Sequence, residues 1–201
     1  KTHVFTATDN FVVTAGQGPV AEVDYFVVAG GGSAAGYYGA GGAGGFRMSN
    51  SLGLPTPTTS PLAGATSLPV GQGTYVVTVG GGGAANPCAP GVGAYDGNKG
   101  NDSVFNPGGV EDSTMITSTG GGFGASSGCL VVGGPGGSGG SSGYYRAPAG
   151  RGLGNTPPTS PSQGNPSGRG SWGTAGGGGG AGAAGSAGTC NCAAGCTPTG
   201  G

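Results

Sequence analysis

Few side chains in this sequence are of the types that carry out acid–base or nucleophilic chemistry. The single histidine, His3, lies in a segment of alternating character, where a packed or edge position on a strand is its expected role. The carboxylates form no catalytic motif, and those beside asparagine are expected in turns, where they accept hydrogen bonds from nearby backbone N–H groups. We therefore predict that the protein is not an enzyme and needs no cofactor. The carboxylates are Asp9, Glu22, Asp24, Asp96, Asp102, Glu111 and Asp112.

Two local motifs offer partial matches to ligand sites. Asp96-Gly97-Asn98, together with Asp102, has the hard oxygens that Ca²⁺ prefers, but the spacing matches no standard calcium loop, and a turn is expected instead. Glycine clusters such as Gly30-Gly31-Gly32 resemble part of a nucleotide-binding loop. No helix is expected after them and no GK[ST] motif is present. We predict neither a metal site nor a nucleotide site.

The five cysteines leave two interpretations open. An extracellular protein commonly pairs its cysteines in disulfides, whereas buried free thiols are the alternative. The C-x-C-x₃-C spacing at residues 190–196 is not a common zinc-finger pattern. Cys129 lies in an apolar run and is the strongest candidate for a buried thiol. The disulfide candidates are Cys88, Cys190, Cys192 and Cys196.

The elements that must support these residues are dominated by glycine at every third position. The step of three is unbroken in residues 170–188 and recurs at 36–45 and 134–143. This period is neither the 3.6 of an α-helix nor the 2 of a strand. It is the period of the extended left-handed polyproline-II type of helix, which has no internal hydrogen bonds. We predict an array of polyglycine-II helices in which lateral backbone contacts replace a side-chain core.

Two other structures are compatible with a glycine-rich composition. Collagen also needs glycine at every third residue, but sustained over a long, proline-rich repeat. The 55 glycines and 15 prolines among 201 residues also fall in the range of disordered chains. Apolar runs with strand character favour an ordered fold over both alternatives.

Short apolar or alternating segments precede several of the glycine blocks. We therefore predict a mainly β and irregular fold, with short strands leading into the glycine array and essentially no α-helix. Residues 22–29 are expected to form a strand buried on both faces, and Asp9-Asn10 and residues 106–109 to form turns. The other predicted strands are residues 2–8, 11–14, 74–79, 103–105, 114–119 and 129–132. The predicted long loops are residues 49–69, 84–101 and 144–171.

Domain organisation follows from the same composition shifts. We predict a β-rich part over residues 1–79, a polyglycine-rich part with exposed loops over 80–188, and a cysteine-containing tail over 189–201. Because Lys1 is not an initiator methionine and no signal peptide is present, we expect a fragment or a processed product.

Charge and hydropathy exclude two classes of partner. Only 6% of residues are charged, the net charge is −1, and the six cations are scattered, which argues against nucleic-acid binding through phosphate contacts. No apolar run approaches the roughly 18–20 residues that span a bilayer, so we predict no membrane insertion.

The order of motifs along the chain resembles a known family. HVFTATDNFVVTAG is followed by VDYFVVAGGG, GAGGAGGFR, YVVTVGGGG, NDSVF, TMITSTGGG and GNTPPTSPSQGN, and then by a terminal glycine block. This order resembles the glycine-rich domain of tail-fibre and adhesin proteins of tailed bacteriophages, over nearly the whole chain up to about residue 188. The cysteines at 190, 192 and 196 depart from the pattern.

The resemblance implies a non-enzymatic virion protein, extracellular, whose glycine-helix core presents loops to a host cell-surface receptor of protein or glycan type. Other virion fibre proteins and further copies of the chain are the expected additional partners. The alternative is a subunit of a self-assembling extracellular filament. Aromatic residues near glycine could pack as caps on the array or contact the receptor. The receptor-contact candidates are Tyr37, Tyr38, Tyr95, Tyr144, Tyr145 and Trp172.

Overall fold

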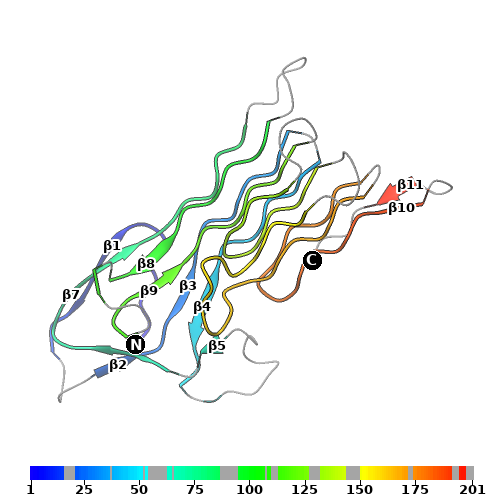
Figure 1. Cartoon of the computed structure of the whole chain (residues 1–201). Coiled ribbons are helices and arrows are strands. Elements are labelled where there is room, and N and C mark those ends of the chain that lie inside the picture. The colour runs from blue at the N-terminus through cyan, green and yellow to red at the C-terminus, as the bar shows by residue number, and fades with distance from the viewer. Residues whose placement is uncertain are drawn as a thin grey trace.

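The computed structural model shows an elongated molecule with small β-sheets at one end and long glycine-rich segments running away from them (Figure 1). No helix is present in the residues that the structure describes. The described residues are 1–15, 21–36, 38–51, 53, 63–64, 66–86, 95–106, 108–109, 113–126, 132–143, 150–171, 174–191 and 195–197.

The β end is built from three small sheets. The largest is antiparallel, with the order β1-β7-β8-β9. Its strands are β1 (Asp9–Val13), β7 (Gly73–Thr78), β8 (Ser103–Phe105) and β9 (Ile116–Ser118). The other two sheets pair β2 (Ala21–Val23) with β6 (Leu68–Val70), and β3 (Phe26–Val28) with β4 (Phe46–Ser49) and β5 (Ala63–Gly64).

A separate hairpin, β10 (Thr189–Asn191) with β11 (Gly195–Thr197), lies at the other end of the molecule (Figure 1). Between the two ends, extended segments lie side by side and form a layered array (Figure 1). These array segments comprise residues 29–36, 39–45, 80–86, 95–102, 119–126, 132–143, 150–155, 163–171, 174–180 and 183–188.

Neighbouring array segments are joined by backbone hydrogen bonds that recur every three residues. From segment 29–36, Ala29, Gly32 and Ala35 donate their N–H groups to segment 39–45, with N···O distances of 3.0, 2.9 and 2.8 Å. The residue that follows each of these donors bonds to segment 95–102. These second donors are Gly30, Ser33 and Gly36, with N···O distances of 3.0, 2.9 and 2.9 Å. Successive residues therefore face different neighbours, as a chain with three residues per turn requires.

The same step recurs across the array, in both chain directions. Segment 163–171 runs antiparallel to segment 174–180, and its donors Asn165, Gly168 and Ser171 are three residues apart. Segment 183–188 runs parallel to segment 163–171, since Gly185 donates to Pro166 O and Gly188 to Arg169 O. The lateral pairing predicted from the glycine period is thus present.

Few large side chains are buried in this structure. Leu68, Val70 and Ile116 are the large apolar side chains that are almost fully covered, and they belong to the β end. Inside the array the covered side chains are small or polar. The largest, Gln163, is fully buried, accepts a hydrogen bond from Thr119 N at 2.8 Å and donates to Pro157 O at 3.0 Å. Backbone contacts therefore take the place of an apolar core in the array.

The alternating patterns at residues 74–79, 103–105 and 114–119 correctly predict β7, β8 and β9, and the turn at 106–109 is confirmed by the bond from Gly109 N to Asn106 O. Two predictions beside β1 are wrong. Residues 2–8 form no strand, since they pair with no ladder in the described structure. Asp9-Asn10 is not a turn but the start of β1, paired with Val77 and Val76.

The strand predicted over residues 22–29 is also wrong in its extent and burial. It divides into β2 and β3, which belong to different sheets. Between them, the Asp24 carboxylate accepts hydrogen bonds from Ser49 Oγ at 2.6 Å and Ser51 Oγ at 2.7 Å, which hold the chain at that point. The Phe26 side chain is 64% exposed, so this stretch is not buried on both faces.

The three predicted long loops are shorter than expected. Residues 49–69 contain β5 and most of β6, and residues 95–101 and most of 150–171 belong to the array. A charged residue can belong to an array segment, since the side chains of Lys99 and Arg151 are exposed while their backbones continue the array. Residues 129–131 of the last predicted strand lie outside the described part of the chain.

Candidate functional site

Several array segments end close together at the end of the molecule opposite the β end, on either side of connections that lie outside the described residues (Figure 1). We call this region the loop end and define it by the described residues that flank each connection. Hydrogen bonds join these flanks directly. Gly36 N donates to Tyr95 O at 2.9 Å, and Gly170 N donates to Ser142 Oγ at 3.1 Å. The flanking pairs are 36 and 38, 86 and 95, 126 and 132, 143 and 150, 171 and 174, and 191 and 195.

Polar side chains fix the flanks of the connection between residues 86 and 95. The Asp96 carboxylate accepts a hydrogen bond from Ser126 N at 2.7 Å, while Asn86 Nδ2 donates to Asp96 O. Asn98 Nδ2 donates to Ala84 O at 2.8 Å and to Asn86 Oδ1 at 3.0 Å. The local turn predicted for Asp96 is therefore wrong, since its carboxylate joins two array segments that are distant in sequence.

Asp102 is used in the same way, because its carboxylate accepts the Gly120 N–H at 2.8 Å. Each of these carboxylates thus satisfies a backbone donor that has no carbonyl partner at that position. Within the described residues, no group of three or more histidine, cysteine or acidic side chains could hold a metal ion.

Two exposed tyrosines stand at the loop end. The side chains of Tyr38 and Tyr95 are 57% and 48% exposed. Tyr38 has a φ of 69°, in the left-handed region that non-glycine residues rarely adopt. Such a conformation costs on the order of 1–3 kcal/mol and is retained where the surroundings impose it. Tyr95 accepts the Gly36 N–H through its carbonyl and Tyr38 follows Gly36 by two residues, so both exposed rings belong to the loop end.

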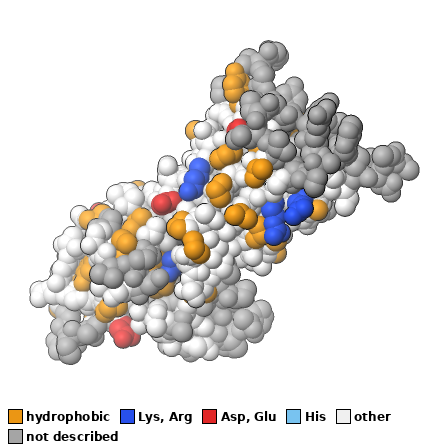
Figure 2. Space-filling model, viewed as in Figure 1, with side chains coloured by type: hydrophobic (Ala, Val, Ile, Leu, Met, Phe, Trp, Pro, Cys, Tyr) orange, Lys and Arg blue, Asp and Glu red, His pale blue; other side chains and the backbone are white. Residues whose placement is uncertain are grey.

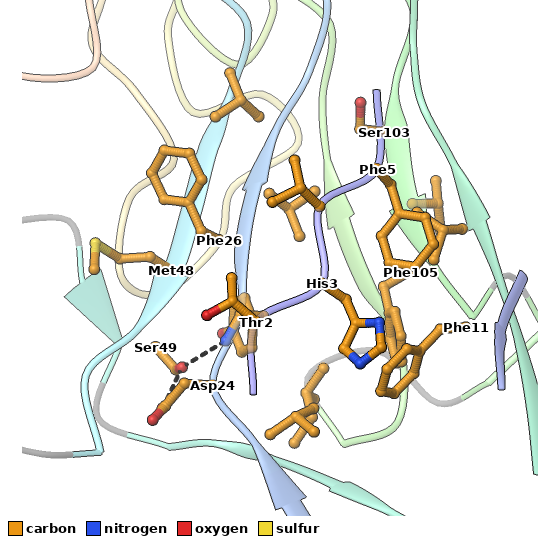
Figure 3. A pocket seen from close by; sticks show the side chains of 18 of the residues that line it. Thr2, His3, Phe5, Phe11, Asp24, Phe26, Met48, Ser49, Ser103 and Phe105 are labelled. Carbon is orange, nitrogen blue, oxygen red and sulfur yellow. Dashed lines mark hydrogen bonds between the residues drawn. The ribbon is translucent and has the colours of Figure 1, made fainter. Parts of the chain in front are cut away.

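A second surface lies at the β end, where the structure has a groove with a volume of about 870 Å³. Residues 1–5 lie across it, between β3 and β8 (Figure 3). His3 and Phe5 point toward Phe11 and Phe105, whereas Phe26 lies on the opposite side (Figure 3). The His3 and Phe11 rings lie 5.2 Å apart, and the Tyr75 and Phe105 rings stack at 5.5 Å.

One wall of this groove carries negative charge. Ser49 and Ser51 donate hydrogen bonds to the Asp24 carboxylate, and these bonds lower its pKa. Ser67 Oγ donates to Glu22 Oε2 at 2.6 Å. The groove therefore combines aromatic side chains with the carboxylates of Glu22 and Asp24 on its β2–β3 wall. Asp24 and the aromatic side chains are shown in Figure 3.

A model of the glycine-rich domain family matches residues 6–201 of the chain. The chain belongs to the glycine-rich domain family. No curated protein and no solved structure matches it. In the described part of this glycine-rich domain, no helix is long and apolar enough to cross a membrane.

Of the six predicted receptor-contact residues of the glycine-rich domain, the structure describes two. The structure places both Tyr38 and Tyr95 at the loop end, since Tyr95 O accepts the Gly36 N–H and Tyr38 follows Gly36 by two residues. Tyr37, Tyr144, Tyr145 and Trp172 lie outside the described residues, and each belongs to a connection whose flanks lie at the loop end. The role of these residues stays a prediction.

Among the disulfide candidates, Cys190 and Cys196 are cross-strand partners in the register of β10 and β11. Cys88 and Cys192 lie outside the described residues, as does Cys129.

The aromatic groove is a site that the sequence reasoning missed. The available signal was the alternation of two segments. In residues 2–8 it places His3 and Phe5 on one face, and in residues 73–78 it places the aromatic Tyr75 on one face of its strand.

Proposed function

We propose that this glycine-rich domain is a non-enzymatic structural part of a bacteriophage tail fibre or adhesin, located on the virion outside the cell. In this proposal the array is a rigid spacer or tip, with other fibre proteins as its neighbours. The three-residue step of the lateral hydrogen bonds supports a polyglycine-II interpretation of the array segments. The order of the sequence motifs supports the phage assignment by resemblance.

The convergence of array connections at the loop end carries the proposal. A rigid scaffold that presents loops at one end is a common way to build a binding surface, because the loops can vary without changing the scaffold. Exposed tyrosine supplies large contact area with few torsions to freeze. We infer that the loop end, including Tyr38 and Tyr95, contacts a host cell-surface protein or glycan.

The tyrosines provide a direct test. The labelled domain is titrated onto a panel of intact bacteria, and the double variant Tyr38→Ala/Tyr95→Ala is compared with Leu153→Ala. Leu153 is 58% exposed and lies on the array, so it is a matched control. We expect the double variant to lose at least about tenfold in affinity, as anchor aromatics do, and Leu153→Ala to bind like the wild type.

Unchanged binding by the tyrosine variant would contradict the receptor role and leave the spacer role. An equal loss in the Leu153 variant would show that binding is not confined to the loop end. Circular dichroism and thermal melting of all variants establish that the fold is intact.

A second candidate function is a self-assembling filament. The outer array segment 80–86 favours it, because the exposed surface of Gly82 is backbone, with which another segment could pair. Sedimentation distinguishes the two functions. Open-ended growth with concentration supports a filament, and a discrete species supports an adhesin module.

A further inference from the structure

Strand β3 has one edge without a partner. Ser49 N donates to Tyr25 O at 3.0 Å, and Ala29 N donates to Gly45 O at 3.0 Å. In an antiparallel ladder, residues two apart bond to the same neighbour, so Val27 also faces β4. The N–H and C=O groups of Phe26 and Val28 therefore point away from β4, and β3 pairs with no other strand in the described structure.

This free edge forms part of the groove at the β end. Phe26 and Val28 line the groove, and both side chains are exposed. Phe105 lines the groove from β8. A free strand edge beside an apolar groove suits an extended peptide. Backbone bonds to the edge supply affinity, and alternate side chains enter the groove.

The chain itself contains a segment of the required kind. Residues 2–8 alternate as a strand does, yet they belong to no ladder. Residues 1–4 are exposed, with Val4 at 79%, and the segment touches the sheet through the rings of His3 and Phe5. A bend at residues 6–8 separates it from β1. Its strand pattern is therefore unused within its own chain.

Charge also matches between the segment and the groove. Lys1 brings a positive charge, whereas the β2–β3 wall carries Glu22 and Asp24. No other charged side chain lines the groove. Opposite charges across a contact favour association and fix its register.

We infer that residues 1–5 of a second copy of this chain add as a strand to the free edge of β3. The incoming backbone bonds to Phe26 and Val28, and its lysine lies near the carboxylates of Glu22 and Asp24. The segment leaves its own chain by rotation at the bend formed by residues 6–8. This association is separate from receptor binding at the loop end, because the two surfaces lie at opposite ends of the molecule (Figure 1).

Two variants of the full chain test the inference by sedimentation velocity over a concentration series. Val28→Pro removes the N–H that faces the groove, and proline is tolerated on a strand edge. Its matched control, Val28→Thr, keeps the N–H and the branched shape. His3→Pro/Val4→Pro removes a donor on each side of the incoming segment, with His3→Ala/Val4→Thr as its control.

We expect the wild type and Val28→Thr to self-associate, and each proline variant to be monomeric alone. A mixture of the two proline variants should form a 1:1 complex, because one supplies an intact segment and the other an intact edge. No added host component is needed, so the result is independent of the proposed receptor function.

The inference is overturned if the wild type stays monomeric up to millimolar concentration. It is also overturned if the mixture of proline variants forms no complex while both remain folded by circular dichroism. Equal self-association of Val28→Pro and Val28→Thr would place the contact elsewhere on the chain and overturn it as well.

Discussion

At interior array positions, glycine is required because neighbouring backbones approach closely. Positive φ angles are recorded for Gly53 and Gly108 and for none of the array glycines that the structure describes. A methyl group at Gly122 would lie 1.9 Å from Gly134 O, and one at Gly140 would lie 1.9 Å from Phe123 O. Backbone atoms cannot move aside as a flexible side chain can, so any side chain there separates two paired segments.

Alanine substitution at Gly122 and Gly182 tests this requirement. Gly122 is buried between segments, whereas a methyl group at Gly182 has nothing within 4 Å. We expect Gly122→Ala to lower the free energy of unfolding by at least about 3 kcal/mol, because overpacking is joined by loss of lateral hydrogen bonds. Gly182→Ala should be neutral, or stabilising by about 0.5–1 kcal/mol, since it restricts the unfolded chain.

Chemical denaturation of both variants measures the difference. Similar stabilities for the two would contradict the close-approach explanation. The sequence alone could not separate these positions, because both lie in glycine-rich stretches. Whether a methyl group fits at a glycine depends on which segment lies beside that glycine in the folded structure.

At the scale of elements, an array segment differs from a β-strand in the direction of its hydrogen bonds. A strand bonds to neighbours on two sides in one plane, with a period of two. Segment 29–36 donates to 39–45 and to 95–102, and Gly83 N donates to its Gly31 O. The array therefore grows in more than one direction, which accounts for its layered appearance in Figure 1.

Amide hydrogen exchange should display this three-residue step. Gly32 and Ser33 donate to Gly42 O and Asn98 O, whereas Gly31, which is only half-buried, donates to no backbone acceptor in the described part of the chain. We expect the Gly32 and Ser33 amides to exchange slowly and the Gly31 amide to exchange faster by a factor of ten or more. Residue-resolved NMR measures the rates. Uniform protection along the segment would contradict the assigned pairing.

Strand prediction succeeded where the partner strand was also visible in the sequence. The alternation in residues 74–79 predicts β7, which is central to its sheet, with partners on both sides. The equally clear alternation of residues 2–8 failed, because alternation makes a strand only where the backbone also pairs with a neighbour, and this segment pairs with none in the described structure. The glycine period correctly predicted lateral pairing, but it could not specify which segments pair. Likewise, the groove depends on segments brought together from distant parts of the chain.

At the scale of the whole molecule, the surface and the interior are less different than in an ordinary domain. Few charged side chains are visible on the face shown in Figure 2, and its hydrophobic side chains form small separate groups. The interior of the array holds buried serine, threonine and backbone in place of large apolar side chains. Folding of this chain therefore removes little apolar surface from water.

The heat capacity change of unfolding should reflect this composition. Exposure of apolar surface raises the heat capacity and exposure of polar surface lowers it. An ordinary domain of this length would show about 2.4–3 kcal/mol/K, and we expect a value well below that range. Differential scanning calorimetry at several pH values measures it. A value inside the ordinary range would indicate a larger apolar core than the described residues form.

The three-residue step also has a mechanical consequence. A segment that slides along its neighbours by one triplet meets the same set of donors and acceptors again, so many pairings are nearly equivalent in energy. On the proposed polyglycine-II interpretation each residue rises about 3.1 Å, so we expect a pulling force along the array to extend it in increments of about 9 Å. We expect larger side chains held between segments, such as those of Gln163 and Phe123, to resist this slippage and hold the native alignment under load.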